Sequence, residues 1–214
     1  MTGNLFENGP LDMRAFEKLA RRRGFTAIAG LDEAGRGALA GPVVAAAVIL
    51  PDRGDFAEIN DSKKLTPAKR ESLYELILEQ ALAVGTGICD HLVVDRINIL
   101  QATLKAMEQA VDNLSVKPDF LLIDGISTPA VTIPSRTIKK GDSASLSIAA
   151  ASIIAKVTRD RMMVNWGEEY PAYGFQIHKG YGSSAHLKAI AECGPCDIHR
   201  KTFRGVREHL RGMK

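Results

Sequence analysis

Short apolar stretches alternate with amphipathic ones along the chain. A short apolar run between turn-forming residues is typical of a buried strand, and apolar side chains at three- and four-residue spacing are typical of a helix packed on a core. We expect strands at residues 26–31, 42–50, 83–89, 120–123 and 131–138. We expect helices at residues 14–23, 66–82, 98–114 and 143–164. Strands come first and then alternate with helices, which predicts an α/β protein with a sheet of mixed direction.

Two of the predicted helices begin with recognisable capping residues. Thr66 is suited to cap a helix whose first residue is Pro67, because proline has no amide proton to leave unpaired there. Asp142 or Ser143 is the expected cap of the long helix that follows.

The composition is that of an ordinary globular protein, with 45% apolar and 25% charged residues. The longest apolar stretch, residues 39–50, contains Gly41 and Pro42 and is too short to cross a bilayer, which excludes a membrane-spanning helix. The N-terminus lacks a signal-peptide pattern, and three cysteines do not make a disulfide framework. We therefore expect one compact cytosolic domain with appendages and reduced thiols.

Charge and aromatic residues gather in the C-terminal part of the chain. Residues 1–155 carry a net charge of −2, whereas residues 156–214 carry +5. Aromatics interleaved with cations and glycines suit stacking on sugars or bases beside phosphates. The alternative is that the cations are solvated, the aromatics pack in a core and the histidines are hydrogen-bonded structural residues. The residues concerned are Tyr170, Tyr173, Phe175, His178, Lys179, Tyr181, His186 and His199.

Acidic residues follow two of the predicted strands. Asp32 and Glu33 open a glycine-rich turn at residues 32–37, and Asp124 follows the strand at residues 120–123. If these strands are parallel neighbours, their carboxylates meet at one edge of the sheet, and Asp142 is near enough to join them. Converging carboxylates repel one another unless a cation lies between them, and oxygen ligands without His or Cys suit Mg²⁺ or Mn²⁺.

A structural interpretation of these acids stands beside the metal hypothesis. An Asp after a strand often only ends it, and Asp142 alone is more typical of a helix cap than of a ligand. Asp32 and Glu33 together are harder to explain in this way, because two adjacent charges gain nothing structurally.

Two motifs in the chain resemble known sites only superficially. Gly35, Gly37 and Gly41 have the spacing GxGxxxG and are followed by Pro42 and β-branched residues, where a dinucleotide-binding motif needs a helix. The turn instead offers open backbone amides and the guanidinium of Arg36 to a sugar-phosphate. Cys193 and Cys196 with His199 lack a fourth ligand at zinc spacing, so we interpret this CxxC as coincidence.

Taken together, the motifs resemble those of bacterial ribonuclease HII. They occur in the family's order from about residue 26 to the C-terminus. The matching stretches are residues 30–37 (GLDEAGRG), 39–44 (LAGPVV), 61–65 (DSKKL), 123–125 (IDG), 140–142 (KGD), 147–160, 173–175 (YGF), 178–182 (HKGYG) and 199–200 (HR). Ser183 stands where the family has Thr, which keeps the hydroxyl, and residues 1–25 lie outside the resemblance.

The resemblance implies a ribonuclease H-like fold, with a mixed five-stranded sheet flanked by helices and a C-terminal helical extension. It divides the chain into an N-terminal extension, residues 1–25, which we expect to be helical, and a catalytic domain, residues 26–214. It also implies an endonuclease that cuts the RNA strand of RNA–DNA hybrids and cuts duplex DNA 5′ to embedded ribonucleotides. We expect no membrane association and a monomer.

The resemblance also assigns roles to residues. Asp32, Glu33, Asp124 and Asp142 match the family's catalytic acids, which we expect to hold two Mg²⁺ or Mn²⁺ ions about 4 Å apart. The motif that reads the ribose 2′-hydroxyl matches Gly35, Arg36 and Gly37, and the tyrosine that senses the RNA–DNA junction matches Tyr181. As phosphate contacts we expect Lys63, Lys64, Lys156, Lys179 and Arg200.

Two other function classes remain possible from the sequence. A nucleic-acid-binding module that has lost catalysis is disfavoured because all four acids are present. A nuclease of the same fold that acts on DNA is disfavoured by the Gly-Arg-Gly turn and Tyr181. Cleavage of an all-DNA duplex would favour this second class.

Overall fold

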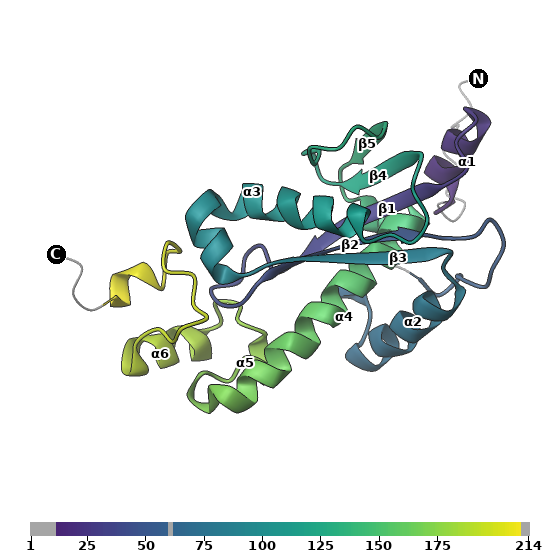
Figure 1. Cartoon of the computed structure of the whole chain (residues 1–214). Coiled ribbons are helices and arrows are strands. Elements are labelled where there is room, and N and C mark those ends of the chain that lie inside the picture. The colour runs from purple at the N-terminus through teal and green to yellow at the C-terminus, as the bar shows by residue number, and fades with distance from the viewer. Residues whose placement is uncertain (1–11, 60–61, 211–214) are drawn as a thin grey trace, which may run out of the picture.

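The structure, a computed structural model, describes residues 12–59 and 62–210 and contains one five-stranded sheet (Figure 1). The strand order is β3-β2-β1-β4-β5. β1 is antiparallel to β2, and β2 to β3, whereas β4 is parallel to both β1 and β5. The predicted mixed α/β sheet is thus confirmed. The strands are β1 (Ile28–Ala34), β2 (Val43–Ile49), β3 (Ala83–Cys89), β4 (Phe120–Asp124) and β5 (Ser135–Ile138).

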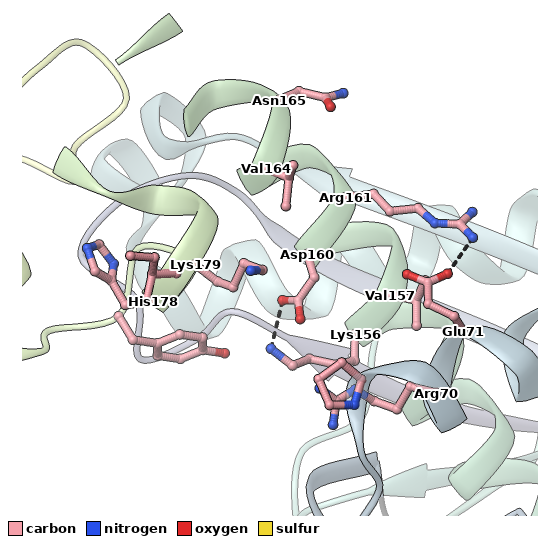
Figure 2. A pocket seen from close by; sticks show the side chains of 13 residues that line it. Arg70, Glu71, Lys156, Val157, Asp160, Arg161, Val164, Asn165, His178 and Lys179 are labelled. Atoms are coloured by element: carbon pink, nitrogen blue, oxygen red, sulfur yellow. Dashed lines mark hydrogen bonds and ion pairs between the residues drawn. The ribbon is translucent and has the colours of Figure 1, made fainter. Parts of the chain in front are cut away.

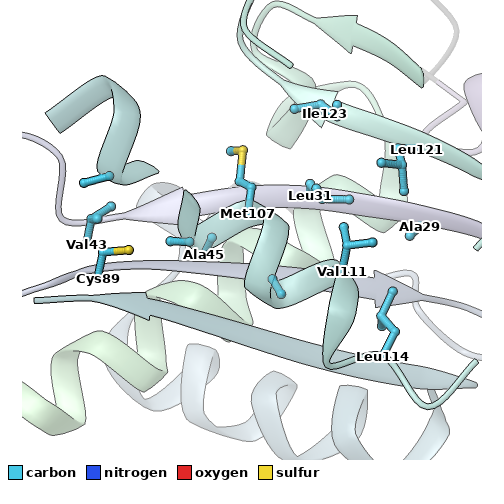
Figure 3. Packing of buried hydrophobic residues seen from close by; sticks show 14 of the residues in the cluster. Ala29, Leu31, Val43, Ala45, Cys89, Met107, Val111, Leu114, Leu121 and Ile123 are labelled. Atoms are coloured by element: carbon cyan, nitrogen blue, oxygen red, sulfur yellow. The ribbon is translucent and has the colours of Figure 1, made fainter. Parts of the chain in front are cut away.

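Helices cover both faces of this sheet. One face packs against α3, and the other packs against α4 and α2 (Figure 1). Strand β2 shows the alternation that makes this possible, since Ala45 and Ala47 face α3 whereas Ala46 and Val48 face α4. Figure 3 shows Ala45 on the α3 side, in the same cluster as Met107 and Val111. The helices are α1 (Ala15–Arg22), α2 (Pro67–Gln80), α3 (His91–Asp112), α4 (Leu146–Glu169), α5 (Phe175–His178) and α6 (Ser184–Cys193).

Strand β1 is longer than its apolar run predicts. The sequence suggests a turn from Asp32 onward, but the structure keeps Asp32, Glu33 and Ala34 in the strand. The reason is pairing with β2, whose register places Ala46 opposite Asp32 and Ala45 opposite Glu33. The acids are therefore held by sheet hydrogen bonding and do not lie in a flexible turn.

The long helix α4 is capped by a residue that the sequence analysis did not select. Ser145, and neither Asp142 nor Ser143, is the N-cap, with its hydroxyl 3.4 Å from the Ile148 amide nitrogen. Residues Gly141–Ser143 form a separate 3₁₀ turn. The buried carboxylate of Glu17, on α1, accepts hydrogen bonds from the Ser145 hydroxyl at 2.6 Å and the Ser147 amide at 2.9 Å. Asp142 is therefore not engaged in capping α4.

Two other helix starts follow local capping chemistry. Thr66 caps α2 through the Lys69 amide, as predicted, although α2 ends at Gln80 and not at residue 82. Helix α3 contains a break at Asn98, where φ is 68°, and the Asn98 side chain accepts from the amides of Leu100 and Gln101. Asn98 thus begins the predicted helix, and a short helical segment from residue 91 precedes it.

The ends of the chain extend this α/β core. The predicted helix in the N-terminal extension is present as α1, which packs beside β4, while residues 1–11 lie outside the described part. The predicted C-terminal helical extension is also present, as α5 and α6 beyond the end of α4 (Figure 1). Among the described residues, no helix has the length and apolar character needed to span a membrane.

Gly30 allows β1 and α4 to approach closely. A Cβ atom at Gly30 would lie 2.1 Å from the Ser147 carbonyl carbon and 2.3 Å from the Ile148 nitrogen. We therefore expect Gly30→Ala to lower the free energy of unfolding by about 1–3 kcal/mol or more, measured by urea denaturation. Gly37→Ala is the matched control, since a Cβ there meets nothing within 4 Å. Equal stability of the two variants would contradict this packing.

Candidate active site

Three carboxylates lie at the carboxyl ends of β1 and β4. The parallel register of these strands ends at the pair Leu31 and Ile123, and Asp32 and Asp124 are the next residues on each strand. Asp142 joins them from the adjacent 3₁₀ turn, whose Gly141 amide donates a 2.6 Å hydrogen bond to Asp124 Oδ1. The two strands are parallel neighbours, which is the condition under which the sequence places these carboxylates at one edge of the sheet.

Glu33 lies next to Asp32 in sequence but faces the other side of the sheet. Consecutive strand residues point to opposite faces. Asp32 lines a groove of about 420 Å³ with Ser152 of α4, whereas Glu33 also lines a second groove, of about 310 Å³, with Met107 of α3. Asp124 lines only the second groove. The side chains of Asp32 and Glu33 therefore face opposite sides of the sheet edge.

Burial and mutual repulsion oppose ionisation of this cluster. Asp32 is only 4% exposed, and burial raises its pKa well above the ordinary value, with further contributions from the charges of Glu33 and Asp124. The Glu33 amide opposes this shift by donating a 2.7 Å hydrogen bond to Asp32 Oδ1. Burial also raises the pKa of Glu33 and of Asp124. The cluster therefore favours positive charge nearby.

Two basic side chains supply part of that charge. Lys63 Nζ lies 3.2 Å from Asp142 Oδ2, and Arg36 Nη1 lies 3.2 Å from Glu33 Oε1. Lys63 belongs to the 3₁₀ turn Ser62–Lys64, and the side chain of Lys64 lies outside what the structure describes.

The carboxylates suit a divalent metal ion by their chemistry. All four donors are oxygen ligands, which hard cations such as Mg²⁺ and Mn²⁺ prefer. Burial raises the pKa values of Asp32, Glu33 and Asp124, and a bound cation would favour their ionised forms. As arranged in the described parts of the chain, no three His, Cys, Asp or Glu side chains form a ready metal-binding group. The ion pairs of Glu33 and Asp142 use oxygens that a metal would need.

The two glycines of the Gly-Arg-Gly loop differ in what the fold requires of them. Gly35 has φ +95°, and a Cβ there would lie 2.0 Å from Arg159 Nε. At Gly37 a Cβ would meet nothing within 4 Å, and φ is not positive. Packing and the positive φ therefore explain why position 35 is a glycine. No contact within the described protein requires a glycine at position 37. The loop leads into β2 and not into a helix, which confirms the rejection of a dinucleotide-binding motif.

Two buried arginines fix the backbone that follows this loop. Arg159 donates to the carbonyl oxygens of Pro42, Ala40 and Lys179 at 2.9–3.0 Å. Arg200 donates to the carbonyl oxygens of Gly41 and Arg36, both at 3.0 Å. Both side chains are fully buried.

The prediction that Arg200 contacts phosphate is therefore wrong. Its guanidinium faces backbone carbonyls in the interior, and burial lowers its pKa to about 9. The sequence did not identify Arg159 as a residue of the site. The available signal is its spacing: Arg159 stands four residues after Ala155 and four before Met163, which are both fully buried, although Lys156, Asp160 and Arg161 around it are charged.

Tyr181 and Lys156 share the 420 Å³ groove with Asp32 and the Gly-Arg-Gly loop, so the structure brings these predicted site residues together. The Tyr181 ring lies 5.6 Å from Lys156 Nζ and 5.2 Å from the Arg159 guanidinium carbon. These distances are in the range of cation–π interactions.

A second basic groove, of about 590 Å³, adjoins this one between α2, α4 and residues 177–181. Lys156 and Lys179 line it and point toward Asp160, with Lys156 Nζ 2.7 Å from the Asp160 carboxylate (Figure 2). Burial lowers the pKa of Lys179, and the charges of Lys156 and Arg70 lower it further. Positive charge thus continues away from the carboxylates along one side of the molecule.

Comparisons with known proteins find relatives that match nearly the whole chain. The family described as Ribonuclease HII matches residues 29–206. Ribonuclease HII of Geobacter metallireducens is 62% identical over 207 residues, which cover 96% of this chain and 97% of that protein. The ribonuclease H2 structure from Pyrococcus horikoshii OT3 has a TM-score of 0.72 and 26% identity, covering 86% of this chain and 96% of that one. Bst-RNase HIII in complex with Mn²⁺ has a TM-score of 0.65 at 20% identity, covering 98% and 77%.

The raised pKa of Asp32 predicts that this residue destabilises the metal-free fold at neutral pH. The folded protein retains a proton that the unfolded chain releases, so stability falls as the pH rises from the ordinary pKa of about 3.8 through the folded pKa. We expect Asp32→Asn to raise the free energy of unfolding at pH 7 in chelator by on the order of 1 kcal/mol.

This gain should shrink as the pH falls toward about 4, where the unfolded aspartate is also becoming protonated. Urea denaturation at both pH values provides the measurement, and Asp55→Asn, at an exposed position, is the control. A gain that does not depend on pH would contradict the electrostatic origin.

Proposed function

The chain belongs to the ribonuclease HII family, the type 2 ribonucleases H, and on this basis we propose that it cuts duplex DNA on the 5′ side of embedded ribonucleotides and cuts the RNA strand of RNA–DNA hybrids. The observation that carries the proposal is a single groove that joins Asp32 and Glu33 to the Gly-Arg-Gly loop and Tyr181. It combines groups that can hold a metal with groups that can recognise a sugar. The corresponding cellular role is removal of misincorporated ribonucleotides and RNA primers.

Asp32, Glu33, Asp124 and Asp142 are the residues that would hold Mg²⁺ or Mn²⁺, two ions during catalysis. Such ions, when bound, stabilise the negative charge that develops on a reacting phosphate. The protein orients two of the acids through backbone amides, since Asp32 accepts from Glu33 N–H and Asp124 from Gly141 N–H. Among the described residues, no histidine lines either groove at the carboxylates, which agrees with a hydrolysis that needs no histidine base.

The same groove would distinguish RNA from DNA. Recognition of RNA depends on the ribose 2′-hydroxyl, which is accessible in the wide minor groove of a hybrid duplex. The backbone at Gly37 is open to a sugar because no protein atom would stand near a Cβ there. Gly35 and Arg36 flank it, and Tyr181 supplies a half-exposed ring in the same groove for the sugar at the RNA–DNA junction.

Lysines around the groove would position the duplex through its phosphates. Lys63 and Lys156 line the 420 Å³ groove, and Lys179 lines the adjoining one. We include Lys64 from its place in the same turn as Lys63. Contacts of this kind bind without reading base sequence, which suits an enzyme that acts wherever a ribonucleotide occurs.

The direct test uses an end-labelled DNA duplex that contains one ribonucleotide, with all-DNA and RNA–DNA controls, in Mg²⁺, Mn²⁺ or chelator. We expect a cut on the 5′ side of the ribonucleotide that leaves a 3′-hydroxyl and a 5′-phosphate, and no cut in all-DNA or in chelator. Asp32→Asn should lose roughly a thousandfold or more in rate while it stays folded, because metal stabilisation is worth several kcal/mol. Asp55→Asn is the matched control. Binding of the hybrid without cleavage by the wild-type protein would favour a binding module.

Gly37→Ala separates recognition from folding. Because nothing in the protein lies near the added methyl group, we expect normal urea stability but at least about a tenfold loss of kcat/KM on the single-ribonucleotide duplex. Gly35→Ala should instead lose stability, since its methyl group meets the Arg159 side chain. Wild-type activity of a folded Gly37→Ala protein would exclude Gly37 from the sugar contact.

A further inference from the structure

Two buried histidines lie behind Tyr181. His186 is on α6, His199 follows α6, and both are 0% exposed. Their Nε2 atoms are 3.0 Å apart. His186 Nδ1 lies 3.0 Å from the Tyr181 carbonyl oxygen, and the Cys196 amide donates to His199 Nδ1 at 2.9 Å. The two imidazoles thus connect the Cys196 backbone to the Tyr181 backbone.

The Cys196 backbone sets the direction of this chain of hydrogen bonds. Its amide nitrogen lies 2.9 Å from His199 Nδ1 and its carbonyl oxygen 3.3 Å, and the shorter contact makes Nδ1 an acceptor. The Cys196 amide can only donate, so His199 Nδ1 accepts and the His199 proton is on Nε2. That proton is donated to His186 Nε2, which places the His186 proton on Nδ1. The Tyr181 carbonyl can only accept, and it receives this proton. The Cys196 thiol, 3.1 Å from His199 Nδ1, is consistent with this assignment because a thiol can donate to the same nitrogen.

The chain of hydrogen bonds requires both rings to be neutral, and their surroundings keep them so. Burial lowers the pKa of His186 and of His199 to about 4 in each case. His178 stacks on His186 with ring centroids 4.4 Å apart. His178 in turn accepts from the Gly180 amide and bonds the Tyr173 carbonyl at 2.7 Å.

Backbone pairing connects the same segments to the Gly-Arg-Gly loop. Tyr181 forms a β-bridge with Ala38, and His199 forms one with Ala40. Between these bridges, the Leu39 amide donates to the Gly180 carbonyl and the Leu39 carbonyl accepts from the Arg200 amide, both at 2.8 Å. The residues just after Gly37 are therefore held between the Tyr181 segment and the His199 segment.

We propose that His186 and His199 are positioning residues, which fix the Tyr181 peptide and thereby set where the Tyr181 ring stands relative to Gly37. The proposal rests on the proposed function, because it assumes that Tyr181 and Gly37 contact the same ribonucleotide. Neither histidine touches the substrate in this arrangement, and both act through Tyr181. A purely structural role would stabilise the fold without changing how the enzyme treats the ribonucleotide.

The test compares two substitutions at His186 by steady-state kinetics on a single-ribonucleotide duplex in Mg²⁺. His186→Gln keeps one acceptor and one donor, whereas His186→Leu keeps an apolar volume and leaves the Tyr181 carbonyl and His199 Nε2–H unpaired. We expect His186→Leu to lose roughly 10–100-fold in kcat/KM, since a displacement of about 1 Å in a positioning element has effects of this size. His186→Gln should stay within about threefold of the wild type.

A double-mutant cycle with Tyr181→Ala shows whether the histidine acts through the tyrosine. We expect His186→Leu to add no further loss in the Tyr181→Ala background. Equal losses in both backgrounds, or equal losses from the Leu and Gln variants, would overturn the proposal. If His186→Leu does not fold by circular dichroism, His186→Asn, which is too short to span both partners, replaces it in the same cycle. Failure of the wild-type protein to cut the duplex would instead count against the proposed function.

Discussion

The guanidinium groups of Arg159 and Arg200 fix the loop beside the acidic edge of the sheet. Both are fully buried, and both donate to backbone carbonyls, with no carboxylate among their hydrogen-bond partners in the described part of the chain. Carbonyl dipoles satisfy a buried cation only when several converge on it, so the chain around each guanidinium has little freedom to shift. Those carbonyls belong to residues 36–42 and to Lys179. The loop beside the acids and the segment that bears Tyr181 are thereby fixed to the same two side chains.

The sheet holds Asp32 where its negative charge is poorly solvated. Asp32 is an interior residue of a strand that is paired on both sides and covered by α4. Water would ordinarily stabilise its charge, and in the protein hydrogen bonds from the Glu33 amide and the Ser152 side chain replace that water only in part. The rest of the fold offsets this unfavourable burial, in particular through the close packing of β1 on α4 at Gly30.

The sequence predicted the architecture and the acidic cluster because both rest on patterns of short range. Apolar runs marked the strands, and the position of Asp124 directly after one of them implied its meeting with Asp32. Other features depend on partners distant in sequence. Pairing with β2 extends β1 through Ala34, and Ser145 caps α4 with support from Glu17, which is 128 residues from Ser145 in sequence. Arg200 was predicted to be a surface cation because no residue near it in sequence reveals its acceptors. Arg159 donates to three backbone carbonyls and Arg200 to two others.

Helix α1 packs against the start of α4 and so belongs to the same folded unit as the sheet. The family match starts at residue 29, after α1 has ended. Yet the Glu17 carboxylate is buried against the first turn of α4, and the Met13 carbonyl accepts from the Leu146 amide at 2.7 Å. A chain trimmed to the matched residues would expose that turn, which begins four residues after Asp142, to water. The part of the chain that defines the family by sequence is therefore shorter than the part that must be kept for the acids to stand in place.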